Sequence, residues 1–260
     1  MALACGYSEP VRLVERFFLA VTGTMREATV GPELLPMVLA QAAAAVLPVE
    51  GAGLSLIKDL RVPIGASDAI VSRAETLQTT LGEGPCLTAV AQEQPLVADL
   101  ATMAAKWPIF HQEFIAQTPY RSVTSVPLRP DAGPPMGALD LYSTRPETLD
   151  PVLVDELTVG VADPIEAMLF PGAPVEDETD VVTKTGWWQQ AKVGDRMLVW
   201  VAVGMLMERT RMNNLDALAV LRGYAFTHQM TLDEVAVNLT GRNLPIDDLV
   251  NYPPGRFSGP

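Results

Sequence analysis

The apolar positions of the first 170 residues change from helical to strand-like spacing along the chain. Apolar residues recur every three or four positions from Val11 to Met25 and from Pro32 to Leu47, which predicts two helices. Alternating or short apolar runs bounded by turn residues predict strands at five places: Ala52 to Ile57, Ala69 to Arg73, Leu96 to Ala98, Arg121 to Leu128 and Met136 to Tyr142.

Two further helices complete this pattern. One runs from Pro85 to Ala91 and begins with a proline, which suits the first turn of a helix. The other runs from about Pro151 to Phe170, where Pro164 is expected to introduce a kink. Terminal helices around several strands predict an α+β domain, in which flanking helices cover an antiparallel sheet.

Residues 187–250 hold three helical patterns in close succession. The first is the apolar run from Met197 to Met207. Asn213 occupies an N-cap position, and apolar residues follow it at helical spacing. Thr231 and Glu234 form a capping-box pattern at the start of the third helix. These patterns predict a compact three-helix module.

The segment between the two parts predicts a linker. Pro171 to Asp180 is rich in proline and acidic residues and poor in core formers. Trp187 and Trp188 follow and are expected to dock the module on the first domain or on a second subunit. A seam with helical spacing, suited to pairing two subunits, comprises Ala191, Asp195, Leu198, Ala202 and Met205. The predicted domains are residues 12–170 and 186–250, joined by a linker at 171–185.

Composition and charge support two folded domains. The 260 residues are 48% hydrophobic and 19% charged, as expected for packed cores rather than disorder. The net charge is −13, and residues 1–170 carry ten basic and twenty acidic side chains, a balance of −10. The first domain is therefore expected to repel nucleic acid and anionic membranes, so that DNA and membranes are not predicted partners.

Cysteine and histidine are too sparse for a disulfide framework, a zinc site or a nucleophile–base pair. Cys5 and Cys86 are the only cysteines, and His111 and His228 the only histidines. No run reaches the roughly 18 apolar residues of a spanning helix, and the first residues lack the pattern of a signal peptide. We predict a cytoplasmic protein that is not an enzyme and has no cofactor or metal.

The segment Gly82-Glu-Gly-Pro-Cys86 is the first candidate for binding chemistry. A glycine-rich turn before a helix can hold a phosphate, but this one lacks the Lys-Ser/Thr ending of a P-loop. A tight turn with positive φ at Gly82 or Gly84 is the favoured interpretation. The alternative places the turn at the mouth of a ligand pocket, with Glu83 as its polar group.

Cys86 and the aromatic residues after position 106 are further candidates. Cys86 has no Lys, Arg or His among its sequence neighbours to lower the pKa of its thiol, so core packing is favoured over a redox role. Trp107, Phe110 and His111 form an aromatic group that either lines a pocket or packs in the core.

Five blocks in the first domain resemble the GAF domains found ahead of ANTAR modules in actinobacterial regulators. The blocks are Gln78-Thr-Thr-Leu-Gly-Glu-Gly-Pro-Cys86, Asp99-Leu100, Lys106-Trp-Pro108, Arg121-Ser-Val-Thr-Ser-Val-Pro-Leu128 and Gly137-Ala-Leu-Asp-Leu-Tyr-Ser143. The resemblance covers roughly residues 12–170 and implies a sensor of a small molecule or of redox state that often dimerises. The residues assigned to ligand binding are Glu83, Cys86, Trp107, Phe110 and Tyr142.

Three blocks in the C-terminal module resemble the ANTAR domain, the RNA-binding module of bacterial transcription antiterminators. The blocks are Ala202-Val-Gly-Met-Leu-Met207, Ala217 with Leu221-Arg222, and Leu232 with Val235-Ala236. The resemblance implies binding to paired RNA hairpins in a leader transcript, which prevents termination. Guanidinium groups suit phosphates and exposed bases. The residues assigned to RNA binding are Arg196, Gly204, Arg209, Arg211, Arg222 and His228.

The charge of the module leaves a second hypothesis open. Residues 195–260 contain six Arg or Lys and seven Asp or Glu, whereas nucleic-acid-binding modules usually carry a basic excess. The first hypothesis is a ligand-responsive antiterminator, a homodimer with structured RNA and an unknown small molecule as partners. The second is a small-molecule sensor whose C-terminal helices mediate dimerisation or protein association without binding RNA.

Overall fold

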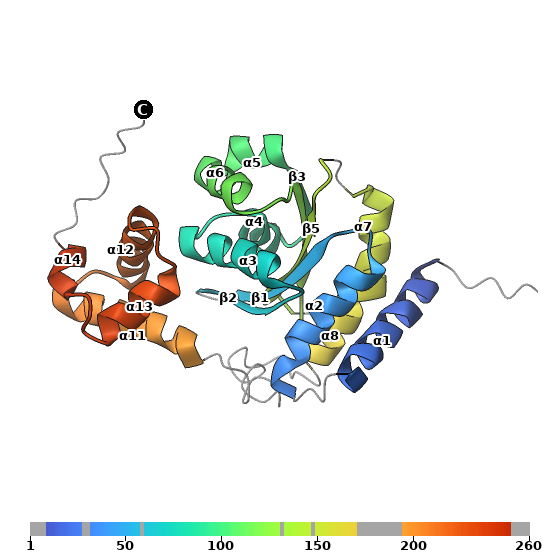
Figure 1. Ribbon diagram of the computed structural model, residues 1–260, viewed down its shortest axis with the longest axis horizontal. Coiled ribbons are helices and arrows are strands. Elements are labelled where there is room, and N and C mark those ends of the chain that lie inside the picture. The colour runs from blue at the N-terminus through green and yellow to red at the C-terminus, as the bar shows by residue number, and fades with distance from the viewer. Residues whose placement is uncertain are drawn as a thin grey trace, which may run out of the picture. The chain divides into compact units, whose positions relative to one another are not determined.

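The computed structural model describes residues 9–27, 32–57, 60–130, 133–146, 149–170 and 194–250 (Figure 1). The chain divides into two compact units. Unit 1 comprises residues 1–75 and 83–191, and unit 2 comprises residues 76–82 and 192–260. The predicted linker at 171–185, the pair Trp187 and Trp188, and Cys5 lie outside the described residues.

Unit 1 contains a five-stranded sheet with the order β2-β1-β5-β4-β3. All neighbouring strands are antiparallel, so the predicted mixture of helices and antiparallel sheet is confirmed. The strands are β1 (Gly51–Ile57), β2 (Arg61–Ala66), β3 (Leu96–Asp99), β4 (Ser122–Leu128) and β5 (Gly137–Ser143).

Strand β2 was not predicted, because Pro63 and Gly65 indicate a turn rather than a strand. Its place at the edge of the sheet explains why proline is tolerated, since an edge strand needs hydrogen bonds on one side only. The pairing of β1 with β2 also shifts register between Leu54 and Ser55, opposite this part of β2.

One face of the sheet packs against the terminal helices and forms the main hydrophobic core (Figure 1). Leu54 and Leu56 of β1 and Leu139 and Leu141 of β5 lie in this core. The helices are α1 (Glu9–Glu27), the 3-10 turn Pro32–Leu34, α2 (Leu35–Val46), α7 (Pro151–Leu157) and α8 (Asp163–Leu169).

The long C-terminal helix predicted for unit 1 is interrupted rather than simply kinked. A π-helical turn, Thr158–Ala162, separates α7 from α8 just before Pro164. Pro164 has no N–H to donate within the helix, and the wider turn absorbs the break in the hydrogen-bond ladder. Gly160 in this turn lets α1 approach closely, because a Cβ there would come within 2.7 Å of the Leu13 side chain.

The other face of the sheet carries α3 (Ala69–Leu81), α4 (Pro85–Gln92), α5 (Leu100–Lys106) and α6 (Pro108–Gln117) (Figure 1). The strand predicted from Ala69 to Arg73 is wrong, because these residues form the first turns of α3. Asp68 explains the error: its Oδ1 accepts hydrogen bonds from the N–H groups of Ile70 and Val71, at 2.7 and 2.9 Å, and so caps the helix. Positive φ is found at both Gly82 and Gly84, as predicted.

The described C-terminal part of unit 2, residues 194–250, contains four helices rather than the three predicted. They are α11 (Gly194–Thr210), α12 (Asn214–Thr227), α13 (Leu232–Thr240) and the additional short α14 (Ile246–Val250). Asn213 caps α12 and Thr231 forms a capping box with Glu234, as predicted. Ala202, assigned to an intersubunit seam, is fully buried, which removes it from any exposed seam.

None of the helices in the described ranges combines the length and the apolar character needed to cross a membrane.

Candidate functional site

The sheet face of unit 1 that carries α3 to α6 is unusually polar. Side chains alternate along a strand, so Gly53 and Ser55 of β1 lie opposite the face of the core residues Leu54 and Leu56. Gly53 pairs with Asp140 of β5, which in turn pairs with Ser125 of β4. Paired residues share a face, and the register therefore brings Asp140 and Ser125 together beside the space left by glycine.

A buried group of polar side chains is built on this face, centred on Arg61. We refer to it as the Arg61 cluster, and its members come from β2, α3, α4, β4 and β5. Each member is exposed by 1% or less. The members are Arg61, Glu75, Cys86, Ser125, Asp140 and Tyr142.

The guanidinium group of Arg61 donates hydrogen bonds in several directions at once. Its Nε donates to Sγ of Cys86 at 2.7 Å, and Nη1 donates to the carbonyl oxygen of Glu75 at 2.7 Å. Its Nη2 lies 2.5 Å from Oε2 of Glu75 and 3.0 Å from Oδ2 of Asp140. Arg61 therefore joins the edge strand, α3, α4 and the centre of the sheet.

Hydroxyl groups donate hydrogen bonds to the second oxygen of each carboxylate, those of Glu75 and Asp140. Ser125 Oγ donates to Oδ1 of Asp140 at 2.5 Å, and the Tyr142 hydroxyl donates to Oε1 of Glu75 at 2.6 Å. Each carboxylate thus accepts hydrogen bonds both from the Arg61 guanidinium and from a hydroxyl group, and such bonds offset the cost of burying a charge.

Burial dominates the electrostatics of the cluster. Burial, together with the nearby charge of Asp140, raises the pKa of Glu75 to about 7, although Arg61 and the Tyr142 hydroxyl act in the opposite direction. Burial also raises the pKa of the Cys86 thiol, despite the neighbouring guanidinium. Cys86 is therefore a protonated thiol at neutral pH, which disfavours a nucleophilic role.

An aromatic layer extends from the cluster toward α6. The ring of Tyr142 lies 5.1 Å from that of Tyr120 and 6.3 Å from that of Phe114, and Phe114 lies 5.1 Å from Phe110. Two of the predicted ligand-binding residues, Tyr142 and Phe110, thus belong to one buried layer. Trp107 is the residue between α5 and α6; it is buried, and Nζ of Lys106 lies 5.9 Å from the centre of its ring.

Glu83 has a structural partner outside the Arg61 cluster. Its Oε1 accepts a hydrogen bond of 3.0 Å from the backbone N–H of Phe110, in the first turn of α6. This contact satisfies one of the N–H groups that a helix start leaves without an intrahelical partner.

Sequence reasoning identified Cys86 and Tyr142 but missed Arg61, Glu75, Ser125 and Asp140. One signal was present: Asp140 interrupts the apolar strand Gly137–Ser143, and a charge in a fully buried strand requires a partner. The partner could not be named, because Arg61 lies 79 residues away in the sequence. Arg61 is also the cation beside Cys86, and it was missed because the two residues are 25 positions apart in the sequence.

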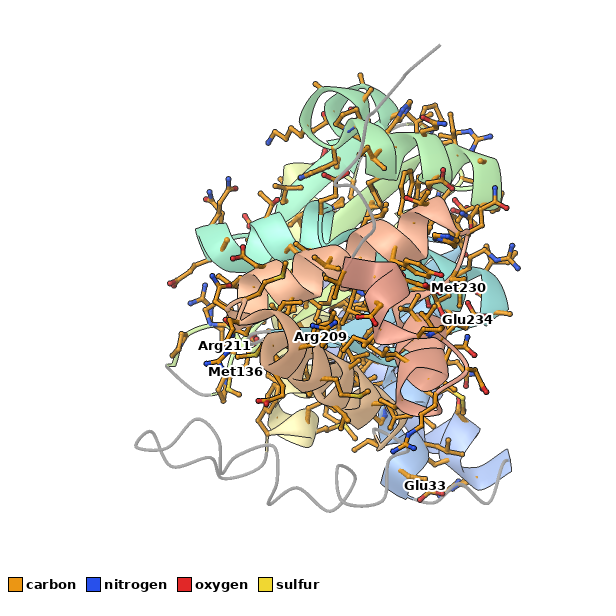
Figure 2. All side chains as sticks on the ribbon, turned by 90° about the vertical axis from the view of Figure 1, so that its left-hand side faces the viewer. Glu33, Met136, Arg209, Arg211, Met230 and Glu234 are labelled. Carbon is orange, nitrogen blue, oxygen red and sulfur yellow. The ribbon has the colours of Figure 1, made fainter. Side chains whose placement is uncertain are left out.

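In unit 2, two of the predicted RNA-binding residues line one open surface groove. Gly204 and Arg209 lie there with Val201, Met205, Glu208 and Ile246. Nη2 of Arg209 is 2.8 Å from Oδ1 of Asp247, and both side chains are exposed. Arg211 follows α11, is exposed and has a positive φ; Arg209 and Arg211 are labelled in Figure 2.

The other predicted RNA-binding residues do not line this groove. Arg222 on α12 is half-buried, and burial lowers the pKa of its guanidinium. His228 at the end of α12 stacks on Tyr224, with ring centroids 3.8 Å apart. Arg196 belongs to α11, but its side chain lies outside the described part of the structure.

Within the described residues, no three His, Cys, Asp or Glu side chains are grouped so as to hold a metal ion.

The sequence matches no protein-family model and no curated protein. Solved structures with a similar fold include the GAF domain of a phosphoenolpyruvate-protein phosphotransferase from Coxiella burnetii, with 14% identity, 61% of this chain and 96% of that chain covered, and a TM-score of 0.42. The corresponding Acinetobacter GAF domain has 12% identity, coverage of 61% and 91%, and a TM-score of 0.44. Free methionine-R-sulfoxide reductase from Neisseria meningitidis has 21% identity, coverage of 64% and 93%, and a TM-score of 0.41.

Proposed function

We propose that the chain is a ligand-responsive regulator of transcription antitermination. Unit 1 acts as a GAF-type sensor that takes a small molecule at the Arg61 cluster, and unit 2 acts as an ANTAR-type module that binds paired RNA hairpins. The observation that carries the sensor assignment is the burial of two carboxylates and a guanidinium on a sheet face that would otherwise hold an apolar core.

The Arg61 cluster is poorly explained by stability alone. Removing each ion from water costs several kcal/mol, and replacing a buried ion pair by apolar residues of similar volume is often neutral or stabilising. A buried titratable group whose pKa is raised by burial and by a neighbouring charge, as at Glu75, is instead a feature of many functional sites.

The sequence blocks that resemble GAF domains surround the same cluster. Arg121–Leu128 and Gly137–Ser143 contain β4 and β5, which supply Ser125, Asp140 and Tyr142. The block from Gln78 to Cys86 forms the end of α3 and the turn into α4, and it supplies Cys86. Three of the five blocks therefore supply four of the six cluster residues, while Arg61 and Glu75 lie outside the blocks.

The RNA-binding half of the proposal rests on the resemblance of unit 2 to ANTAR modules. Most residues of its three blocks are buried, which accounts for them as packing residues: Ala202, Val203, Leu206, Ala217, Leu221, Leu232, Val235 and Ala236. RNA contacts are therefore assigned to side chains that do not pack in the core. Arg211 and His228 are exposed, and Arg222 is half-buried. The stacked ring of His228 suits an unpaired base.

Protein association through unit 2 is the second candidate function, and the groove on α11 favours it. Val201, Met205 and Ile246 give this groove an apolar lining, and a Cβ added at Gly204 would meet nothing within 4 Å. Arg209, the cation at this groove, is paired with Asp247. Such a surface suits an apolar partner better than a phosphate backbone.

Binding to a labelled paired-hairpin leader RNA across a salt series tests the proposal. Arg211→Ala and Arg222→Ala should each weaken binding and reduce its salt dependence, because each removes a cation whose contact with phosphate releases counterions. Arg73→Ala, an exposed arginine of unit 1, is the matched control and should leave binding unchanged. Failure to bind at low salt would favour protein association instead.

A further inference from the structure

The last turn of α3 belongs to the same compact unit as the C-terminal helices. Unit 2 includes residues 76–82, whereas the earlier turns of α3, up to Glu75, belong to unit 1. Thr80 is buried there, and its Oγ1 accepts a long hydrogen bond of 3.4 Å from the backbone N–H of Leu232. Leu232 is the first residue of α13, so this bond satisfies an N–H group that a helix start leaves without an intrahelical partner.

The guanidinium group of Arg222 packs against the backbone of Gly82, just after α3. Its Cζ, Nη1 and Nε lie so close to the Cβ position of Gly82 that a larger residue would collide with them. Gly82 also has a φ of 70°, a conformation that favours glycine. Gly82 is therefore suited both to the local backbone and to the position of the Arg222 side chain.

This packing removes Arg222 from water without giving it an anionic partner. Arg222 is half-buried, and its Nε is buried and has no hydrogen-bond partner within the described residues. Burial lowers the pKa of the guanidinium for this reason. A partly desolvated charge without a partner is costly. A phosphate group, which guanidinium groups bind well, therefore competes with the packed position of Arg222.

We propose that the last turn of α3 is an autoinhibitory contact, which holds the Arg222 guanidinium against Gly82 and so withholds it from RNA. This inference rests on the proposed RNA-binding function of unit 2 and names the regulation of that function. RNA binding requires Arg222 to leave Gly82, so the affinity of the chain for RNA is set by competition between an RNA phosphate and the α3 turn.

The same helix connects this contact to the Arg61 cluster. Glu75 is a member of the cluster and directly precedes residues 76–82 on α3. Hydrogen bonds between successive turns hold a helix together, so a shift of Glu75 also moves the turn that contacts Arg222. A change in the cluster thereby acts on an RNA-contacting residue of unit 2 through a single helix.

Gly82→Asn in the full chain tests the inference. Asparagine tolerates a positive φ better than most residues with a side chain, and its Cβ would take the place of the guanidinium. Because the flexible Arg222 side chain then turns outward, we expect the affinity for paired-hairpin RNA to rise roughly fivefold or more. Gly23→Asn makes the same change on α1, where nothing lies within 4 Å of a new Cβ, and should leave the affinity unchanged.

Arg222→Ala identifies the residue through which the gain arises. Gly82→Asn combined with Arg222→Ala should bind RNA no better than Arg222→Ala alone, because the released side chain is absent. If the wild type binds RNA, an equal affinity of Gly82→Asn or a gain that persists in the double variant would overturn the inference and leave the proposed function standing. Binding by Gly82→Asn alone would support both, and binding by neither protein would contradict both.

The wild-type protein shows without RNA whether Arg222 is held in solution. Exchange of the Nε–H with water, followed by NMR, should be slower at Arg222 than at the exposed Arg73, because Nε of Arg222 is buried. Thr80→Val removes the acceptor of the Leu232 N–H without adding bulk, and should raise both this exchange rate and the RNA affinity. Equal exchange at Arg222 and Arg73 in the wild type, or no effect of Thr80→Val, would contradict the inference.

Discussion

Oδ2 of Asp140 lies 3.0 Å from Nη2 of Arg61, and neither side chain reaches solvent. The pair joins the edge strand β2 to the central strand β5, which are separated by β1 in the sheet. A buried ion pair is mutually dependent, because removal of one partner leaves the other charged and desolvated. This dependence gives the Arg61 cluster measurable consequences for stability, for pH response and for binding.

Loss of the Arg61 guanidinium should strongly destabilise unit 1. Arg61→Ala leaves Glu75 and Asp140 without their cation, and the expected loss in the free energy of unfolding is about 3–5 kcal/mol, measured by urea denaturation. Arg73→Ala removes an exposed arginine from α3 and should change stability by less than about 0.5 kcal/mol. Similar effects of the two substitutions would mean that the cluster is not intact in solution.

Stability should fall as the pH rises from about 4.5 to about 7. A carboxyl group whose pKa is raised by folding binds its proton more tightly in the folded state, so its stabilising contribution is lost once the solution pH passes the folded pKa. Burial raises the pKa of both Glu75 and Glu166 to about 7. Glu75→Gln and Glu166→Gln should therefore each reduce the slope of unfolding free energy against pH.

The pH measurement also separates the two groups. Glu75 is fully buried, whereas Glu166 is only half-buried and accepts a backbone hydrogen bond from Arg129 at 2.8 Å. Glu75→Gln should consequently remove the larger part of the slope, which for a fully buried group is up to about 3 kcal/mol over this range. An unchanged slope in Glu75→Gln would contradict the assigned direction of its pKa.

Two glycines should respond to alanine in opposite directions. Gly53→Ala places a Cβ against the Glu75 carboxylate and should cost about 1–3 kcal/mol, as overpacking does. Gly23→Ala lies in α1, where nothing stands within 4 Å of the new Cβ, and should stabilise by up to about 1 kcal/mol. Differential scanning calorimetry of both variants checks the sign, and a neutral Gly53→Ala would show that Glu75 can move aside.

Gly204→Ala separates folding from binding in unit 2. The position is helical and has open space around its Cβ, so alanine should raise stability by about 0.5–1 kcal/mol. If the groove contacts RNA or a second protein at close range, the same Cβ should weaken that binding. Gly223→Ala, also helical and open but outside the groove, is the control and should stabilise without affecting binding.

The sheet and helices of unit 1 were largely predictable, because local patterns determine them. The strands β4 and β5 and the helix α1 follow from apolar spacing alone. The two wrong predictions in unit 1 also have local causes. Asp68 caps α3, so a run with strand-like spacing forms a helix. Pro63 and Gly65 are typical of turns, so the edge strand β2 was not predicted. In unit 2, the caps at Asn213 and Thr231 were visible in the sequence and are formed as predicted.

The candidate site was less predictable, because it depends on contacts between distant residues. Tyr142 and Glu75, joined by a 2.6 Å hydrogen bond, are 67 positions apart. Glu75 occupies a helix whose spacing gives no sign that one carboxylate turns inward. Arg61 lies in β2, the strand that was not predicted, so its position at the centre of the cluster could not be predicted either. Sequence periodicity indicates which face of an element is buried, but not which charges meet there.

We propose that the Arg61 cluster of unit 1 controls RNA binding by unit 2. The most direct test compares the affinity of the full chain for a paired-hairpin RNA in the wild type, in Asp140→Asn and in the control Arg73→Ala, with circular dichroism to verify folding. We expect a change of roughly fivefold or more in Kd for Asp140→Asn alone, the range typical of coupling between sites. Equal RNA affinity in all three folded proteins, or no RNA binding in any of them, would contradict it.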